Sequence, residues 1–155
     1  MTERSSFAAY LRGAVGGLVN AYGATSAVLN ATGCDIVIVE TLSVGQNEVD
    51  IVRHAQTVVL LESPGAGDAV QAGNAGLMEI GDVYVVNRAD QNGAPRHMQQ
   101  FGELLANSMP RNGWSPAVIA TYALNGTGIA ELRATLDARG AQMRIACYLN
   151  RRVST

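Results

Sequence analysis

Four short apolar runs give the chain its most regular pattern. They occupy residues 35–39, 57–62, 83–86 and 117–120, and most of their members are aliphatic. None alternates apolar and polar residues as a half-exposed strand does, so each is typical of a central strand in a parallel sheet that helices cover on both faces. We therefore expect four parallel strands.

Helical patterns separate these runs. Residues 95–109 carry apolar positions at helical spacing with polar residues between them, which predicts a surface helix packed on the sheet. A second stripe predicts a helix after the fourth run and consists of Ile129, Leu132 and Leu136. An earlier helix should end before Gly33, because glycine commonly terminates helices. Strands and helices that alternate in this way predict an α/β fold in three layers around a parallel sheet.

Composition limits the number of domains and the class of partner. The chain has 155 residues, 48% of them hydrophobic, which suits a single domain spanning residues 1–155. Residues 1–12 have no strong pattern, and residues 140–155 are expected to form a helical tail. The net charge of -2 leaves no basic surface, so neither nucleic acid nor an anionic membrane is an expected partner.

Three features predict a cytoplasmic protein. No apolar run approaches the roughly 18 residues needed to span a bilayer, and the start of the chain lacks the order of a secretory signal. Cys34 and Cys147 are far apart and belong to no CxxC motif, which is typical of isolated thiols in a reducing compartment.

The loop after the third run carries the most specific chemical pattern, Asn87-Arg88-Ala89-Asp90. Ligands of open α/β sheets bind at the carboxyl ends of the strands, where this loop lies. A carboxylate accepts hydrogen bonds from the ring N–H and exocyclic amine of guanine but repels the acceptor edge of adenine, so Asn-x-x-Asp favours guanine. An ordinary turn, in which Asn and Asp are also common, explains the pattern equally well.

Six segments together resemble the G domain of the MeaB/ArgK-type GTPases, the chaperones associated with methylmalonyl-CoA mutase. They are GAVGG from residue 13, GCDIVIVETLSVGQNE from 33, PGAGD from 64, MEIGDVYVVNRAD from 78, WSPAV from 114 and YALNGTGI from 122. Their order and spacing make the resemblance specific. It implies a three-layer parallel sheet of P-loop NTPase (G domain) type, missing the first strand and the phosphate loop.

The resemblance also implies roles for residues at the strand ends. Glu40 and Gln46 would be the catalytic residues, and Glu40 would also approach Mg²⁺, possibly through water. The guanine pocket would comprise Asn87, Arg88, Asp90, Tyr122, Ala123 and Leu124. Two switches would follow the first two strands and comprise Ser43, Gly45, Asn47, Glu48, Gly65, Gly67 and Asp68. The implied cofactors are GTP or GDP and Mg²⁺, and the implied partners are an adenosylcobalamin-dependent mutase and a second copy of the chain.

The chain departs from the family where nucleotide phosphates bind. The sequence holds no GxxxxGK[ST], the motif whose backbone N–H groups and lysine hold the phosphates, and all of its basic residues are arginine. Ser43 replaces a hinge glycine near the γ-phosphate. The resemblance therefore implies a GTP-binding protein that gates cofactor loading and protection of the mutase, while hydrolysis by this chain alone is not expected. Two alternatives stay open: a non-catalytic remnant or interaction module, and a phosphate loop supplied by another polypeptide.

Overall fold

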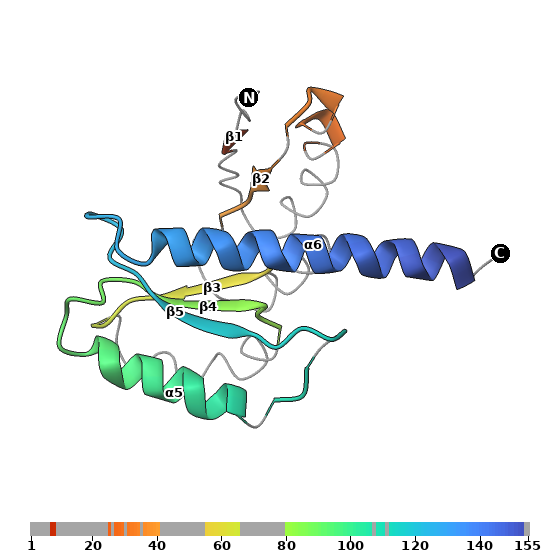
Figure 1. Cartoon of the computed structure of the whole chain (residues 1–155). Coiled ribbons are helices and arrows are strands. Elements are labelled where there is room, and N and C mark those ends of the chain that lie inside the picture. Colours follow the sequence, from red (N-terminus) through yellow and green to blue (C-terminus); the bar gives the residue numbers. More distant parts are fainter. Residues whose placement is uncertain are drawn as a thin grey trace. The chain divides into compact units, whose positions relative to one another are not determined.

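The computed structural model describes residues 7–8, 25, 27–29, 31–34, 36–40, 55–65, 80–106, 108–110 and 112–153. The helices and strands in chain order are β1 Phe7–Ala8, β2 Val37–Ile38, β3 Val59–Glu62, β4 Val83–Val86, α5 Ala94–Ala106, β5 Ala117–Ala120 and α6 Ile129–Val153 (Figure 1). The chain divides into two compact units, Met1–Ala55 and Gln56–Thr155, which are treated separately below. The expectation of a single domain stays a prediction.

The second unit is built on a parallel sheet of three strands, with β4 between β3 and β5. Helix α5 covers one face of this sheet and α6 covers the other (Figure 1). The predicted α/β fold with a parallel sheet between helical layers is therefore confirmed. Strands β4 and β5 have the bounds that the sequence predicted, because their apolar runs are short and flanked by polar or turn-forming residues.

The core lies on both faces of β4, whose residues are all at most 1% exposed. Successive side chains of a strand point to opposite faces, so alternate residues of β4 belong to two different hydrophobic clusters. Tyr84 and Val86 pack with α5, and the ring centroids of Tyr84 and Phe101 lie 5.2 Å apart. The opposite cluster contains Val83, Val85 and Ile119, with Leu132 and Leu136 of α6 packed against it. Two residues of the predicted apolar stripe of α6, Leu132 and Leu136, thus contact the sheet, whereas Ile129 is 42% exposed.

Strand β3 is less covered than the sequence predicted. Its side chains alternate between exposed and half-buried positions, and Val59 and Leu61 are 40% and 64% exposed. The register places these two residues beside Val83 and Val85, on the face that α6 covers. Helix α6 packs over β4 and β5 but leaves this edge of the face uncovered, so burial on both faces was wrong for β3.

The first unit contains a pairing that the sequence did not predict. Phe7 and Ala8, in the weakly patterned N-terminal residues, form a two-residue strand parallel to Val37–Ile38. The expected strand at 35–39 is therefore present in part, as β2, which pairs with β1 in the first unit. The described sheet of the second unit has three strands. Ile38 is 58% exposed, so burial of this strand on both faces was also wrong.

A helical segment precedes β2 and ends as the sequence predicted. Thr32 N donates to the oxygen of Val28 at 3.0 Å, and Cys34 N donates to the oxygen of Leu29 at 3.2 Å. Between them Gly33 has a φ of 85°, the left-handed conformation that glycine adopts at helix ends without the strain of a Cβ.

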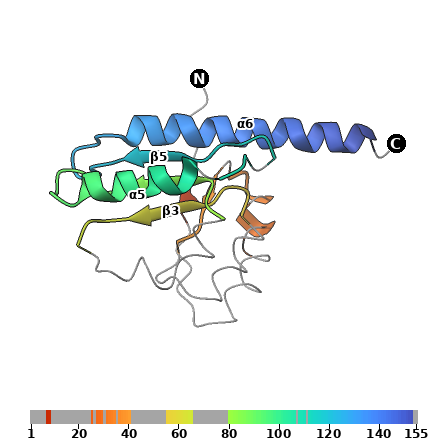
Figure 2. The same ribbon diagram turned by 90° about the horizontal axis from the view of Figure 1, so that it is seen from below.

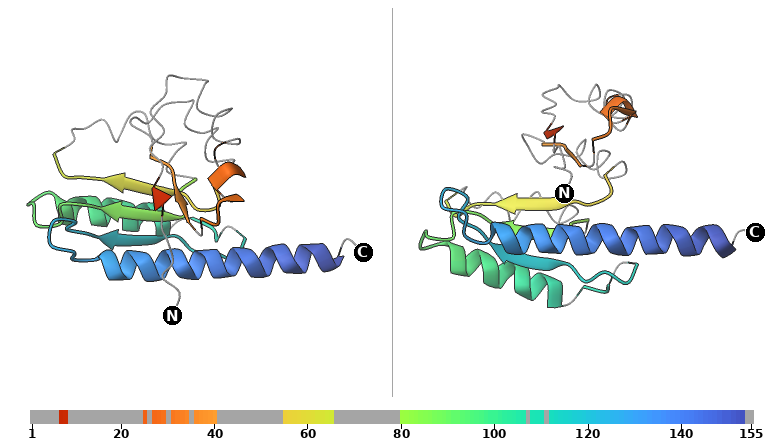
Figure 3. Two further views of the ribbon diagram at one scale, coloured as in Figure 1. Left: turned by 90° about the horizontal axis from the view of Figure 1, so that it is seen from above. Right: turned by 45° about the horizontal axis from the view of Figure 1, so that its top comes forward.

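Helix α6 runs unbroken past Gly140 and extends well beyond the end of the sheet (Figures 2 and 3). Its 25 residues correspond to about 37 Å, whereas a four-residue strand spans about 13 Å. Within the described part of the chain, no helix has both the length and the hydrophobicity needed to cross a bilayer.

A buried polar network fastens α6 to the amino end of the sheet. The Asp82 carboxylate accepts hydrogen bonds from Val58 N and from Arg139 Nη2, both at 2.9 Å. The backbone oxygen of Asp82 accepts another from Trp114 Nε1 at 2.9 Å, and the Arg139 guanidinium lies 5.5 Å from the centre of the Trp114 ring. The side chains of Asp82 and Arg139 are 11% and 8% exposed. We call these four residues the Asp82 network.

Candidate functional site

The loop after β4 has a constrained backbone. Arg88 has a φ of 54°, a left-handed conformation that side chains other than glycine adopt at a cost of about 1–2 kcal/mol. Gln91 N donates to the oxygen of Arg88 and Ala94 N donates to the oxygen of Gln91, both at 3.0 Å. The loop therefore turns straight into α5, and its neighbours must hold the unfavourable conformation of Arg88.

Asn87 joins this loop to the loop after β5. Its side-chain oxygen Oδ1 accepts a hydrogen bond from Thr121 Oγ1 at 3.2 Å and another from Ala123 N at 3.3 Å. A backbone bond of 3.0 Å from Ala89 N to the oxygen of Thr121 adds a third link. Both loops lie at the carboxyl end of the sheet, the same end in Figure 1. With Oδ1 engaged, the amide nitrogen of Asn87 has no recorded partner among the described residues.

The loop after β5 closes on itself before α6 begins. Tyr122 N donates to the oxygen of Thr127 at 3.0 Å, and Thr127 N donates to Asn125 Oδ1 at 3.0 Å. Gly128 then has a φ of 75°, and a Cβ at this position would overlap the backbone oxygen of Ala120. Only glycine lets the start of α6 approach the end of β5 this closely.

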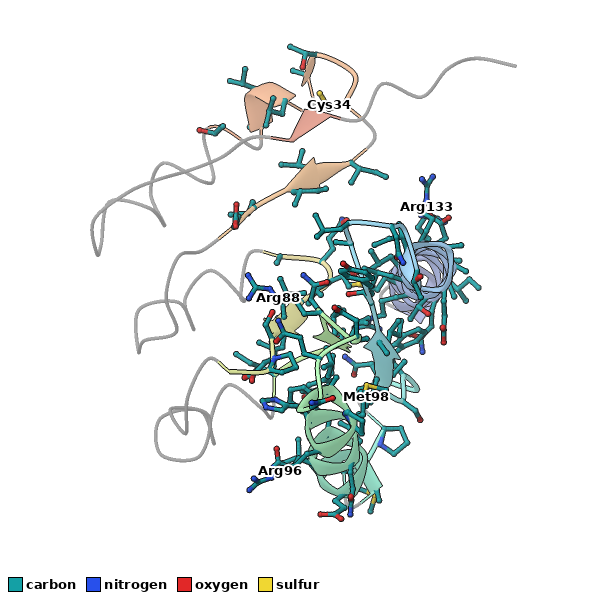
Figure 4. All side chains as sticks on the ribbon, turned by 90° about the vertical axis from the view of Figure 1, so that its left-hand side faces the viewer. Cys34, Arg88, Arg96, Met98 and Arg133 are labelled. Carbon is teal, nitrogen blue, oxygen red and sulfur yellow. The ribbon has the colours of Figure 1, made fainter. Side chains whose placement is uncertain are left out.

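The two loops present their remaining groups to solvent. Arg88, Asp90 and Ala123 are exposed, and Leu124 is 88% exposed. Tyr122 is half-buried. Figure 4 looks onto this end of the sheet, where the labelled Arg88 side chain lies. The structure thus brings all six predicted guanine-pocket residues to two loops that are hydrogen-bonded to each other.

The end of β3 lies beside the same two loops. Asn87 N donates to the backbone oxygen of Glu62 at 2.8 Å, so the residues that follow β3 reach the same edge of the sheet. Gly65, predicted for the second switch, has a φ of 85° in a turn after the buried Pro64. The sheet therefore places the start of this predicted switch next to the predicted guanine pocket.

The other predicted site residues belong to the first unit or lie outside the described residues. Glu40 is exposed at the end of the segment that contains β2, in the first unit. Those that lie outside the described residues are Ser43, Gly45, Gln46, Asn47, Glu48, Gly67 and Asp68. Within the described ranges no three His, Cys, Asp or Glu side chains gather closely enough to hold a metal ion.

Thr121 is the residue of this site that the sequence did not single out. It is only 2% exposed, its hydroxyl orients the Asn87 amide, and its backbone oxygen holds Ala89. The signal was present, since a hydroxyl residue directly follows an apolar strand, but such residues are common in turns of every kind. The partner at Asn87 is visible only in the folded chain.

Comparisons with known proteins agree with the resemblance seen in the sequence. The family described as "Methylmalonyl Co-A mutase-associated GTPase MeaB" matches residues 5–154. A Pyrococcus horikoshii protein named as a GTPase is 47% identical over 126 residues, 78% of this chain and 39% of that protein. GTPase ArgK of Escherichia coli is 36% identical over 107 residues, 66% of this chain and 32% of ArgK. The methylmalonic aciduria type A homolog of Caenorhabditis briggsae, a mitochondrial protein, is 31% identical over 137 residues, 83% of this chain and 33% of the homolog.

The chain spans much less than the whole of these relatives. Between about a third and two fifths of each relative is matched. The match nevertheless includes both loops described above, because the family match covers residues 5–154.

Proposed function

Since the chain belongs to the MeaB family of methylmalonyl-CoA mutase-associated GTPases, we propose that its loops after β4 and β5 bind a guanine nucleotide. The observation that carries this proposal is the double hydrogen bond to Asn87 Oδ1 from Thr121 Oγ1 and Ala123 N. It fixes the Asn87 amide in one orientation and leaves its N–H groups to donate to the acceptor edge of a base.

The other groups of the two loops complement the rest of the base. Asp90 is exposed beside Asn87, where its carboxylate accepts from the ring N–H and the exocyclic amine of guanine. Ala123 offers a short side chain at the base edge, and the 88% exposed Leu124 offers an apolar surface to one face of the ring. The aliphatic stem of Arg88 would cover the base and ribose in the same way.

Phosphate and metal chemistry would come from elsewhere in the assembled site. Mg²⁺ is usually held by one or two carboxylates together with substrate phosphates and water, so Glu40 fits as a single carboxylate donor and not as a complete protein site. When bound, the ion would neutralise charge on the phosphates. The sequence has no lysine to hold them, so the chain by itself should bind guanine nucleotides weakly and hydrolyse GTP at a negligible rate.

We place this activity in the cytoplasm, in a protein that gates cofactor loading and protection of an adenosylcobalamin-dependent methylmalonyl-CoA mutase. The family description, which names that mutase, supports this partner. A second copy of the chain is a further proposed partner. The competing proposal is an interaction module that keeps the fold without using nucleotide, and the missing lysine is the observation that favours it.

Calorimetric titration of the chain with GDP and ADP tests the proposal. We expect GDP to bind and ADP not to bind, because Asp90 repels the acceptor edge of adenine. Asp90→Asn should weaken GDP binding by about 10-fold to 100-fold, in line with about 1–3 kcal/mol for the loss of a paired polar contact. The same variant should favour xanthosine diphosphate, whose second keto group accepts from the new amide.

Asp137→Asn is the matched control, because Asp137 is an exposed aspartate on α6 whose side chain pairs with Arg133 away from the two loops. It should leave the GDP titration unchanged. Equal binding of GDP and ADP, or equal loss in both variants, would contradict the guanine site. Binding of neither nucleotide would favour the interaction module.

A further inference from the structure

The turn after β3 is fastened to the loop after β4 and to the start of α5. Besides the backbone bond from Asn87 N to the oxygen of Glu62, the Glu62 carboxylate Oε2 lies 3.7 Å from His97 Nδ1. The buried Pro64 packs so closely on Gly93 that a Cβ there would lie 3.0 Å from Pro64 Cβ. We call residues 62–65, the last residue of β3 and the turn that follows it, the Pro64 turn. One backbone bond, one apolar contact and one ion pair therefore hold it to the loop after β4 and the start of α5.

Of these three contacts only the ion pair responds to pH. The side chains of His97 and Glu62 are 19% and 14% exposed, so water screens their interaction less than it screens a surface pair. Burial raises the pKa of Glu62 above its ordinary value of 4.5, and the charge of His97 acts in the opposite direction. Histidine ordinarily changes charge between pH 5 and 8. The two side chains attract each other only when the carboxylate is ionised and the imidazole carries a proton.

The other charged groups on the neighbouring elements are exposed to solvent. They are Arg88 and Asp90 in the loop after β4, and Arg96 and Glu103 on α5. Figure 4 labels Arg88 and Arg96. Their fields at the pair are weakened by water, whereas Glu62 and His97 interact directly. The Glu62–His97 pair is thus the charged contact that water screens least at this turn.

We propose that Glu62 and His97 form a titratable latch that holds the Pro64 turn against the guanine loop. The latch is closed when both side chains are charged and loosens when the imidazole becomes neutral. It restrains Pro64 and Gly65, the described residues of the predicted second switch. The regulation rests on the proposed function, because it takes the loop after β4 to be the guanine site.

The shared residue is Asn87, which connects the latch to the ligand. Its side chain faces the proposed base, and its backbone N–H is bonded to Glu62. A nucleotide that orders Asn87 also favours the closed turn, and by thermodynamic linkage the closed latch favours the nucleotide by the same factor. A fall in pH toward 6 should therefore tighten GDP binding.

Hydrogen exchange of the full chain without nucleotide tests the latch directly. The Asn87 amide reports on the turn because it donates to the backbone oxygen of Glu62. We expect its protection factor, corrected for the intrinsic exchange rate, to fall about fivefold between pH 6 and pH 8. This is the largest effect expected on the local opening equilibrium from an ion pair that retains some solvent contact. Glu62→Gln and His97→Gln keep the size of each side chain and should remove this pH response.

Asp137→Asn is again the control, since it breaks the exposed pair in which Arg133 Nε lies 3.1 Å from Asp137 Oδ2 on α6. It should keep the full pH response at Asn87. A wild-type amide whose protection does not change with pH overturns the latch. A pH response of Asn87 protection that survives in Glu62→Gln or His97→Gln also overturns it. In that case each variant lowers the protection by the same factor at pH 6 and pH 8, which indicates a purely structural contact.

The latch and the guanine site fail in different measurements. If GDP does not bind while Asn87 protection still depends on pH and on Glu62, the guanine site is wrong and the latch stands. If GDP binds while protection is independent of pH, the latch is wrong and the guanine site stands. Equal affinity for GDP at pH 6 and pH 8 would contradict the coupling between them.

Discussion

Breaking the buried pair of the Asp82 network should destabilise the second unit strongly. Arg139→Met keeps most of the side-chain volume but leaves the Asp82 carboxylate buried, with the hydrogen bond from Val58 N as its remaining recorded partner. Removing one partner of a buried ion pair typically costs about 3–5 kcal/mol, because the other charge stays without compensation.

Two smaller effects modify this figure. Loss of the guanidinium from the Trp114 ring adds about 0.5–1 kcal/mol. In the native chain Arg139 Nε is buried without a hydrogen-bond partner in the described residues, so its removal raises the free energy of unfolding by about 1 kcal/mol. We therefore expect Arg139→Met to lower the free energy of unfolding by about 2.5–5 kcal/mol, a large share of the total stability of a small domain.

Urea denaturation followed by Trp114 fluorescence is a suitable assay, because Trp114 is the sole tryptophan and belongs to the network. A double-mutant cycle with Asp82→Asn should give a coupling energy of about 2 kcal/mol or more, since the double variant buries no unpaired charge. The control cycle, Arg133→Met with Asp137→Asn, removes a pair whose side chains are both 60% exposed and should give about 0.5 kcal/mol or less.

Two results would refute this reasoning. If the effects of Arg139→Met and Asp82→Asn simply add, the two charges do not stabilise each other in the folded chain. If the buried and the exposed cycle give equal coupling energies, burial does not strengthen the pair, and the attachment of α6 to the sheet must depend on its apolar stripe alone.

Two further changes test the loops and the pH dependence of stability. Gly128→Ala should lower the stability measured by thermal unfolding by about 3 kcal/mol or more, because its Cβ would overlap the Ala120 oxygen in a left-handed backbone. Gly126→Ala is the control, since Gly126 has a φ of 83° but open space around it, and should cost only about 1 kcal/mol. Burial raises the pKa of Glu62 above 4.5, so the contribution of Glu62 to the free energy of unfolding is complete below pH 4.5 and is lost as the pH rises through the folded pKa. Glu62→Gln should remove that loss of stability, and a variant with the wild-type pH dependence of stability would contradict the assignment.

The apolar runs at β4 and β5 were sufficient to predict the centre of the fold. Each run is short and apolar, with polar or turn-forming residues on either side, so period and length agree on a buried strand. The helix predicted at 95–109 is present as Ala94–Ala106, a difference within the usual uncertainty of helix ends. The Asn-x-x-Asp pattern is also visible in the sequence, because Asn87 and Asp90 are close in the chain, and its guanine role stays a prediction.

The solvent exposure of the strands was harder to predict from the sequence. The runs at β2 and β3 are as apolar as the others, yet Ile38 and Leu61 are 58% and 64% exposed. Apolarity shows that a strand can be buried, but the neighbouring strands and helices decide whether it is. The short pairing of Phe7 with Val37 was missed for a related reason, because two residues carry no measurable period.

The sequence by itself determined the order of the strands and helices described in the second unit, the parallel α/β class and the Asn-x-x-Asp pattern after β4, because these depend on local period and residue type. Only the tertiary structure decided that Thr121 orients Asn87, that His97 faces Glu62 and that Arg139 neutralises Asp82. Each of these pairs joins residues that are more than 30 positions apart in the chain. A pairing of this kind depends on strand register and helix packing, which no local pattern of the chain encodes.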